Sequence, residues 1–189
     1  MKIDLLEVGR SPILAGAMNG RMALNRLLEA ASSERDGPEP IFLDFSDIDV
    51  ATASFLRESV LAFREIIRKR KSNFYPAIAN ANDVVQDELL EVLRSRGEAI
   101  MLCSLGKNEN VSNAFPLGEL DPKQRMTFDL VRRHGITDAG ELMREYGQSE
   151  GTKHTTAWNN RLSSLSSLGL VIEDSQGRSK RYRPLFEGS

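Results

Sequence analysis

The sequence has 189 residues, of which 40% are hydrophobic and 28% are charged, and its formal net charge is −2. This balance is typical of a globular chain and excludes a disordered one. No apolar run approaches the roughly 18 residues that a membrane helix needs, and the first residues lack the basic-then-apolar order of a secretory signal. A cytoplasmic protein without a membrane partner is therefore expected.

Positive charge is concentrated toward the C-terminus. Residues 1–118 contain 14 Lys and Arg against 17 Asp and Glu, whereas residues 151–183 contain 6 against 2. Such a segment favours contact with phosphates, because their neutralisation releases condensed counterions. The excess is small, so one copy is expected to bind weakly and a homodimer is expected to bind better.

The first hundred residues alternate between helical and extended patterns. Apolar residues recur at helical spacing over residues 14–31, 53–69 and 83–96. Short apolar runs predict strands over residues 41–45, 75–81 and 99–105, and an edge strand within residues 3–8. This alternation predicts an α/β domain, residues 1–106, in which helices pack on a largely parallel sheet.

A second compositional break separates this domain from the rest of the chain. Residues 106–116 have little periodicity, and a new helix is signalled by Asp121 as N-cap and Pro122 at the first helical position. The sequence therefore predicts a linker over residues 107–119 and a second, α+β domain over residues 120–189.

Motifs of catalysis and of cofactor or metal binding are missing. The chain has no phosphate-binding loop, nucleophile elbow, His-Glu-x-x-His or dinucleotide fingerprint. His134 and His154 have no Cys or carboxylate at metal-ligand spacing. Asp44 directly follows a buried strand, where it is either a site residue or a structural residue at the strand end. Asp47 and Asp49 are expected to be solvated residues of a loop. We expect no enzyme activity, no cofactor and no metal.

The single cysteine, Cys103, excludes an internal disulfide and a cysteine-rich zinc site. It lies in the apolar run of the strand predicted over residues 99–105. Free cysteine behaves mainly as a small hydrophobe, which favours a buried structural residue over the alternative, a redox sensor.

The run from Ile41 to Leu56, IFLDFSDIDVATASFL, resembles the central strand, loop and helix start of the STAS superfamily. This superfamily includes the anti-sigma-factor antagonists and the tails of sulfate transporters. A helix that carries Gly20 and Arg21 before this run is similar to the STAS-like group of bacterial regulators. The resemblance covers residues 10–105 and implies a STAS-like mixed sheet with helices, a signal-receiving or dimerisation role, and a kinase-like ATPase as partner.

The same resemblance singles out Ser54. Antagonists carry Asp-Ser-Ser-Gly at this helix start, and a partner kinase phosphorylates the second serine, which falls on Ser54 by register. Here the segment is Thr52-Ala53-Ser54-Phe55, with Thr in place of Asp and Phe in place of Gly. Ser54 is thus either a phosphoacceptor at a helix N-terminus, where backbone N–H groups favour phosphate, or Ser54 or Thr52 simply caps the helix.

The second domain has the pattern of three helices followed by a hairpin. Helices are predicted over residues 121–133, 137–146 and 152–168, the second opening with a capping box at Thr137. Strands are predicted over residues 170–174 and 182–185, joined by a basic tip. This order resembles the winged helix-turn-helix domain of bacterial transcription regulators over residues 120–186.

The third helix is the candidate reader of DNA. At 100° per residue, Trp158, Leu162 and Leu165 share the core face, which excludes Trp158 as a base-stacking platform. The opposite side carries hydrogen-bonding side chains, and Asn suits adenine in the major groove. The alternative is a polar face that contacts only water. The predicted DNA-binding residues are Lys153, Thr155, Thr156, Asn159, Asn160, Arg161, Ser163, Arg178, Lys180 and Arg181.

Two functions remain open. The first is a transcriptional regulator that binds double-stranded DNA, with Arg161 reaching a phosphate or else tying the domain together through an acidic residue. The second is an adaptor that pairs with a kinase-like ATPase and uses the winged helix as a docking module.

Overall fold

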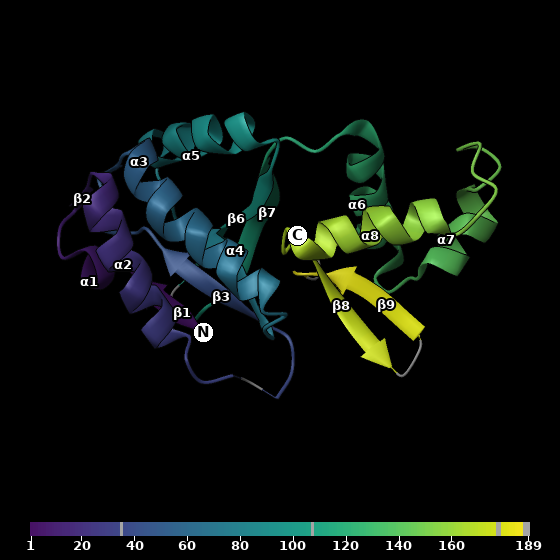
Figure 1. Cartoon of the computed structure of the whole chain (residues 1–189), viewed down its shortest axis with the longest axis horizontal. Coiled ribbons are helices and arrows are strands. Elements are labelled where there is room, and N and C mark those ends of the chain that lie inside the picture. Colours follow the sequence, from purple (N-terminus) through teal and green to yellow (C-terminus); the bar gives the residue numbers. More distant parts are fainter. Residues whose placement is uncertain (35, 107, 177–178, 187–189) are drawn as a thin grey trace. The chain divides into compact units, whose positions relative to one another are not determined.

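The computed structural model describes residues 1–34, 36–106, 108–176 and 179–186 (Figure 1). Contacts between residues divide the chain after Glu119 into an N-terminal and a C-terminal unit. None of the helices in the described ranges combines the length and the apolar character that crossing a bilayer requires.

The N-terminal unit is mixed α/β. Its helices are α1 (Leu5–Gly9), α2 (Ala17–Ala30), α3 (Ala53–Leu56), the π-helical η1 (Arg57–Leu61), α4 (Ala62–Lys69) and α5 (Asp83–Arg96). Its strands are β1 (Lys2–Asp4), β2 (Ile13–Leu14), β3 (Glu39–Asp44), β4 (Val50–Ala51), β5 (Phe74–Ala79), β6 (Ala99–Leu105) and β7 (Val111–Gly118). α3, η1 and α4 follow one another directly, so they form the single helical segment that the sequence predicts over residues 53–69.

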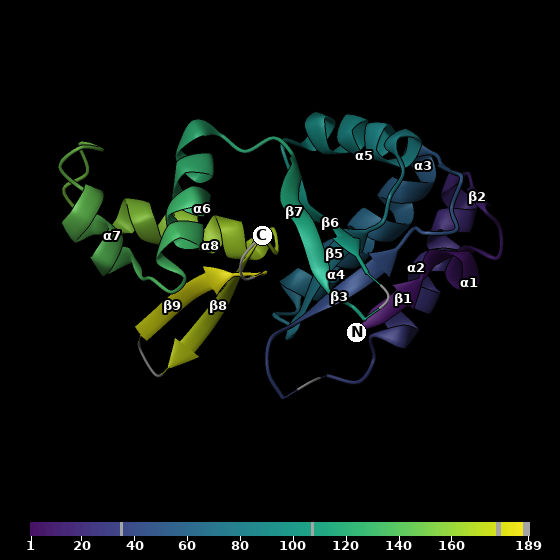
Figure 2. The ribbon, with the colours of Figure 1, turned by 180° about the vertical axis from the view of Figure 1, so that it is seen from behind.

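Five strands form one sheet in the order β1-β3-β5-β6-β7. The first four are parallel and β7 is antiparallel to β6, which confirms the prediction of a largely parallel sheet. β2 and β4 form a separate parallel pair. In Figure 1, α2 and α4 lie in front of the sheet, and from behind, in Figure 2, the strands lie in front of these helices.

One core joins the helices to the sheet. Leu27 and Leu89 from the helices and Leu43 and Ile100 from the strands are fully buried in the same cluster. Each such side chain contributes roughly 1.5–3 kcal/mol by leaving water. Gly20 allows α2 to approach closely, because a Cβ there would lie 2.8 Å from the carbonyl oxygen of Phe55.

The segment predicted as a linker, residues 107–119, is largely the edge strand β7, so that prediction was wrong. β7 pairs with β6 from Ala99↔Gly118 to Leu105↔Val111, with a register shift between Leu102 and Ser104. The alternating pattern of a strand is hidden in the sequence by this irregularity and by Pro116, which an edge strand tolerates.

Asp44 is a structural residue that links neighbouring strands of the sheet. Its carboxylate accepts hydrogen bonds from Ser46 Oγ at 2.7 Å, Asn80 Nδ2 at 2.9 Å and Lys2 Nζ at 3.0 Å. Burial alone would raise the pKa of Asp44, but these hydrogen bonds outweigh it and hold the pKa below its usual value. The side chain thus ties together the ends of β1, β3 and β5.

The C-terminal unit contains three helices and a hairpin. These are α6 (Pro122–His134), α7 (Ala139–Tyr146), α8 (Thr156–Ser167), β8 (Val171–Gln176) and β9 (Ser179–Pro184). β8 and β9 are antiparallel, and Thr137 adds an isolated antiparallel bridge to Tyr182. The bridge attaches the turn between α6 and α7 to the hairpin.

Aspartates set the starts of the first two helices of this unit. Asp121 caps α6 as predicted, with Pro122 at the first helical position and Gly135 as the C-cap. α7 begins one residue later than the capping box predicted at Thr137, because Asp138 is the N-cap and Glu141 completes its box. The Asp138 carboxylate accepts from the backbone N–H groups of Gly140 and Glu141, which satisfies two of the free donors at this helix end.

Cys103 is buried on β6, as predicted for a structural cysteine. Burial, and to a smaller degree the Asp44 carboxylate, raises the pKa of its thiol to about 11. At pH 8 the thiolate fraction is therefore about 100-fold lower than for an ordinary cysteine. We expect a thiol-specific chromogenic disulfide to react slowly with the native chain and at once in guanidinium chloride. Rapid reaction of the native protein would show that Cys103 is accessible, as a redox sensor must be.

Candidate nucleic-acid interface

α8 is anchored by Trp158, which is completely buried together with Leu162 and Leu165. The indole Nε1 donates a hydrogen bond to Thr152 Oγ1 at 3.1 Å. The prediction that Trp158 is a core residue is confirmed. Because the three apolar side chains share one arc of the helix, the opposite arc of α8 faces outward.

The outward arc of α8 carries neutral polar groups. Thr156, Asn160 and Ser163 are exposed on this arc, and Asn159 is exposed on its flank. In the part of the chain that the structure describes, the side-chain amides of Asn159 and Asn160 make no hydrogen bond. These groups are therefore available to a partner without loss of an internal contact.

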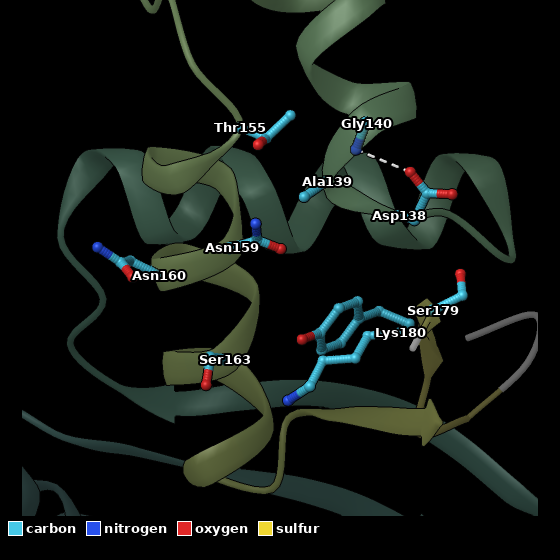
Figure 3. A pocket seen from close by; sticks show the side chains of 10 residues that line it. Asp138, Ala139, Gly140, Thr155, Asn159, Asn160, Ser163, Ser179 and Lys180 are labelled. Atoms are coloured by element: carbon cyan, nitrogen blue, oxygen red, sulfur yellow. Dashed lines mark hydrogen bonds between the residues drawn. The ribbon is translucent and has the colours of Figure 1, made fainter. Parts of the chain in front are cut away.

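This arc borders a hollow of about 560 Å³ (Figure 3). The start of α7 forms one wall, α8 a second and β9 a third. Figure 3 shows Asn159 directed toward α7 and Asn160 directed away from it. The lining residues are Asp138, Ala139, Gly140, Thr155, Asn159, Asn160, Ser163, Ser179, Lys180 and Tyr182. Five of the ten residues predicted to bind DNA thus line the hollow and are exposed: Thr155, Asn159, Asn160, Ser163 and Lys180.

Arg161 lies in the scaffold and not on the predicted contact surface. It is 8% exposed, its guanidinium lies 4.7 Å from the centre of the Trp158 ring, and Nη1 is 3.4 Å from the Glu150 carboxylate. The structure thus has the second of the two roles predicted for Arg161, a tie to an acidic residue. The sequence alone left both open because Glu150 lies in a turn of unpredicted geometry.

The hairpin cations are paired within the unit. Lys180 Nζ is 2.6 Å from Glu173, and Arg181 Nη2 is 3.3 Å from Glu141. Both cations lie inside β9 and not in the hairpin tip where they were predicted. Arg178, which was also predicted to touch DNA, lies outside the described residues. Phosphates would have to compete with Glu141 and Glu173 for Lys180 and Arg181.

Two other cations are not neutralised in this way. Lys153 is exposed, but α8 begins at Thr156 and not at Thr152 as predicted, so Lys153 precedes the helix. Arg144, which the sequence did not single out, is exposed on α7, and its Nη1 lies 3.5 Å from where a Cβ on Gly140 would be. Neither residue forms an ion pair within the described ranges.

Ser54 lies at the start of α3, where Thr52 and Glu88 already accept hydrogen bonds from the backbone N–H groups. Thr52 is the N-cap of α3, and its Oγ1 accepts from the backbone N–H of Phe55 at 3.4 Å and lies 3.2 Å from Ser54 Oγ. The Glu88 carboxylate accepts from the N–H of Ala53 at 2.7 Å. The predicted cap is therefore formed by Thr52. A phosphate on Ser54 would meet the negative charge of Glu88.

No candidate metal site is present among the described residues, because no group of three or more His, Cys, Asp or Glu side chains is placed to hold an ion there.

The sequence was compared with known proteins. No protein-family model matches it, and no curated protein matches it.

Arg161 offers a test of the scaffold. Arg161→Ala leaves Glu150 without its partner and removes the contact with Trp158, so we expect the C-terminal unit to lose roughly 1–3 kcal/mol of unfolding free energy. Trp158 is the only tryptophan, so its fluorescence during urea unfolding reports this unit alone. The matched control is Asn160→Ala, an exposed neighbour expected to stay within about 0.5 kcal/mol of the wild type. Equal midpoints for both variants would contradict the scaffold role.

Proposed function

We propose that the chain is a cytoplasmic transcriptional regulator whose C-terminal unit is a winged helix-turn-helix domain. α8 enters the major groove of double-stranded DNA, and the hairpin of β8 and β9 lies along the phosphate backbone. A STAS-like N-terminal unit receives a signal or forms a homodimer. The protein carries out no catalysis and needs no cofactor.

The observation that carries this proposal is the outward arc of α8. Exposed helix faces commonly carry Glu and Lys, whereas this arc offers Thr, Asn and Ser, which hydrogen-bond to base edges. The arc stands beside a hairpin that bears Lys180 and Arg181, and hairpin cations of this kind contact phosphates. α6 and α7 complete the three-helix order of such domains, with α8 in the position of the reading helix.

The electrostatics support binding by two copies. Residues 120–189 contain 11 Lys and Arg against 9 Asp and Glu, and Glu141 and Glu173 partly neutralise the hairpin. One copy thus has little phosphate attraction. Two copies on one duplex would bring a second hairpin and a second α8 to the adjacent turn, which multiplies affinity without new chemistry.

A second candidate function, a protein-interaction adaptor, is favoured by exposed apolar side chains on α2. Met18 is 76% and Met22 is 50% exposed, and they lie one helical turn apart. Methionine suits adaptable protein contacts. In this alternative a kinase-like ATPase docks on the N-terminal unit and the C-terminal unit also binds protein. A gel shift on DNA that flanks its own gene separates the two: a shift supports the regulator, and a stable co-purifying partner without any shift supports the adaptor.

Two exposed cations of the C-terminal unit, Arg144 and Lys153, test the DNA interface. We expect Arg144→Ala and Lys153→Ala to weaken binding to every duplex and to reduce the slope of log affinity against log salt by about one each, since each removes one phosphate contact. Fluorescence anisotropy of the full chain with a labelled duplex at several salt concentrations measures both quantities. Arg70→Ala, which removes an exposed arginine of the N-terminal unit, is the control. Slopes that stay unchanged in both test variants would exclude this interface.

The acidic partners of the hairpin should limit affinity. Glu141→Gln keeps the side-chain oxygen that completes the cap of α7 and removes only the charge that holds Arg181. We expect it to raise affinity for any duplex by about 2–5-fold, the gain of one freed phosphate contact. Glu145→Gln removes the same charge from the same helix, at a carboxylate that contacts the His134 ring and not Lys180 or Arg181, and so serves as the control. An equal gain in duplex affinity for both variants would show that net charge, and not the release of Arg181, causes the effect.

A further inference from the structure

The outward face of α8, the candidate reading helix, carries no charged side chain. Among residues 156–167, the only ionisable side chain is Arg161. The structure holds that guanidinium against Trp158 and Glu150, on the inner side of α8. The outward arc therefore presents amides and hydroxyls without a cation.

This arrangement decides which base the helix can recognise. Guanine presents two acceptors, O6 and N7, in the major groove, and its usual partner is Arg or Lys with two parallel donors. Adenine presents the N6 amino donor and the N7 acceptor. A carboxamide, with one acceptor oxygen and one donor NH2, matches this pair, whereas it offers guanine only its NH2 group.

The geometry distinguishes the two amides. At 100° per residue, Asn160 lies about 200° from Trp158 and thus opposite the buried arc, whereas Asn159 lies on the flank at about 100°. Figure 3 shows the same difference, with Asn159 directed toward α7. Asn160 is also exposed, and its amide has no partner in the described ranges.

We infer that Asn160 recognises adenine in the major groove through N6 and N7, and that α8 contributes base specificity without contributing to the salt dependence of binding. The inference rests on the proposed function. Phosphate attraction comes from side chains outside the outward arc of α8, such as Lys153 and Arg144. Specificity and electrostatic affinity are thus carried by different elements of the unit.

The test begins with selection of preferred duplexes from a random pool by the full chain, followed by replacement of each selected adenine with 7-deazaadenine. This analogue loses the N7 acceptor and keeps Watson–Crick pairing. At one position we expect wild-type affinity to fall about 10-fold, as for loss of one bidentate contact. Asn160→Ala should bind the unmodified site about 10-fold more weakly, lose less than about 2-fold on the analogue, and keep the wild-type salt slope.

Asn159→Ala is the matched control and should retain the full sensitivity to the analogue. Trp158 fluorescence confirms that both variants are folded. Selected sites that depend on guanine only, a full analogue effect in Asn160→Ala, or a changed salt slope in that variant would overturn the inference and leave DNA binding intact. If the wild type binds no duplex even at low salt, the proposed function fails as well.

Discussion

The burial of Trp158 is the constraint on which the binding surface depends. Trp158 packs inward with Leu162 and Leu165, and two further contacts hold α8 in this orientation: the hydrogen bond from the indole to Thr152 and the Arg161 guanidinium over the Trp158 ring. Thr152 precedes α8 and Glu150 holds Arg161 from the same turn, so the turn before the helix fixes its rotation. With that rotation fixed, Asn160 must face outward. The surface is thus a consequence of the core.

In the proposed regulator, the ion pairs of the hairpin affect specificity as well as affinity for DNA. Glu141 and Glu173 lower the sequence-independent attraction between Arg181, Lys180 and phosphates, and they leave the neutral arc of α8 unchanged. Because a regulator must find its site among many competing ones, the ratio of specific to non-specific affinity matters more than either value. Internal carboxylates that weaken only the non-specific part raise that ratio.

Local signals in the sequence were sufficient to predict most helices and strands. Contacts between residues far apart in the sequence could not be predicted from it. Helical periodicity and the Asp121-Pro122 start gave α6, and the position of Trp158 relative to Leu162 and Leu165 gave the buried side of α8. The edge strand β7 was missed because its irregular register hides the alternation. The pairing of Arg181 with Glu141 joins residues 40 positions apart, so the sequence could show the charge but not its neutralisation.

The start of α3 is closed by a side chain from another helix. Its first N–H group is bound by Glu88, a side chain of α5 from 35 residues farther along the chain. A negative group added to Ser54 would compete with Glu88 for the same helix end. The new charge would therefore weaken the hydrogen bond between Glu88 and the N–H of Ala53, while the buried core still holds α5 against α3.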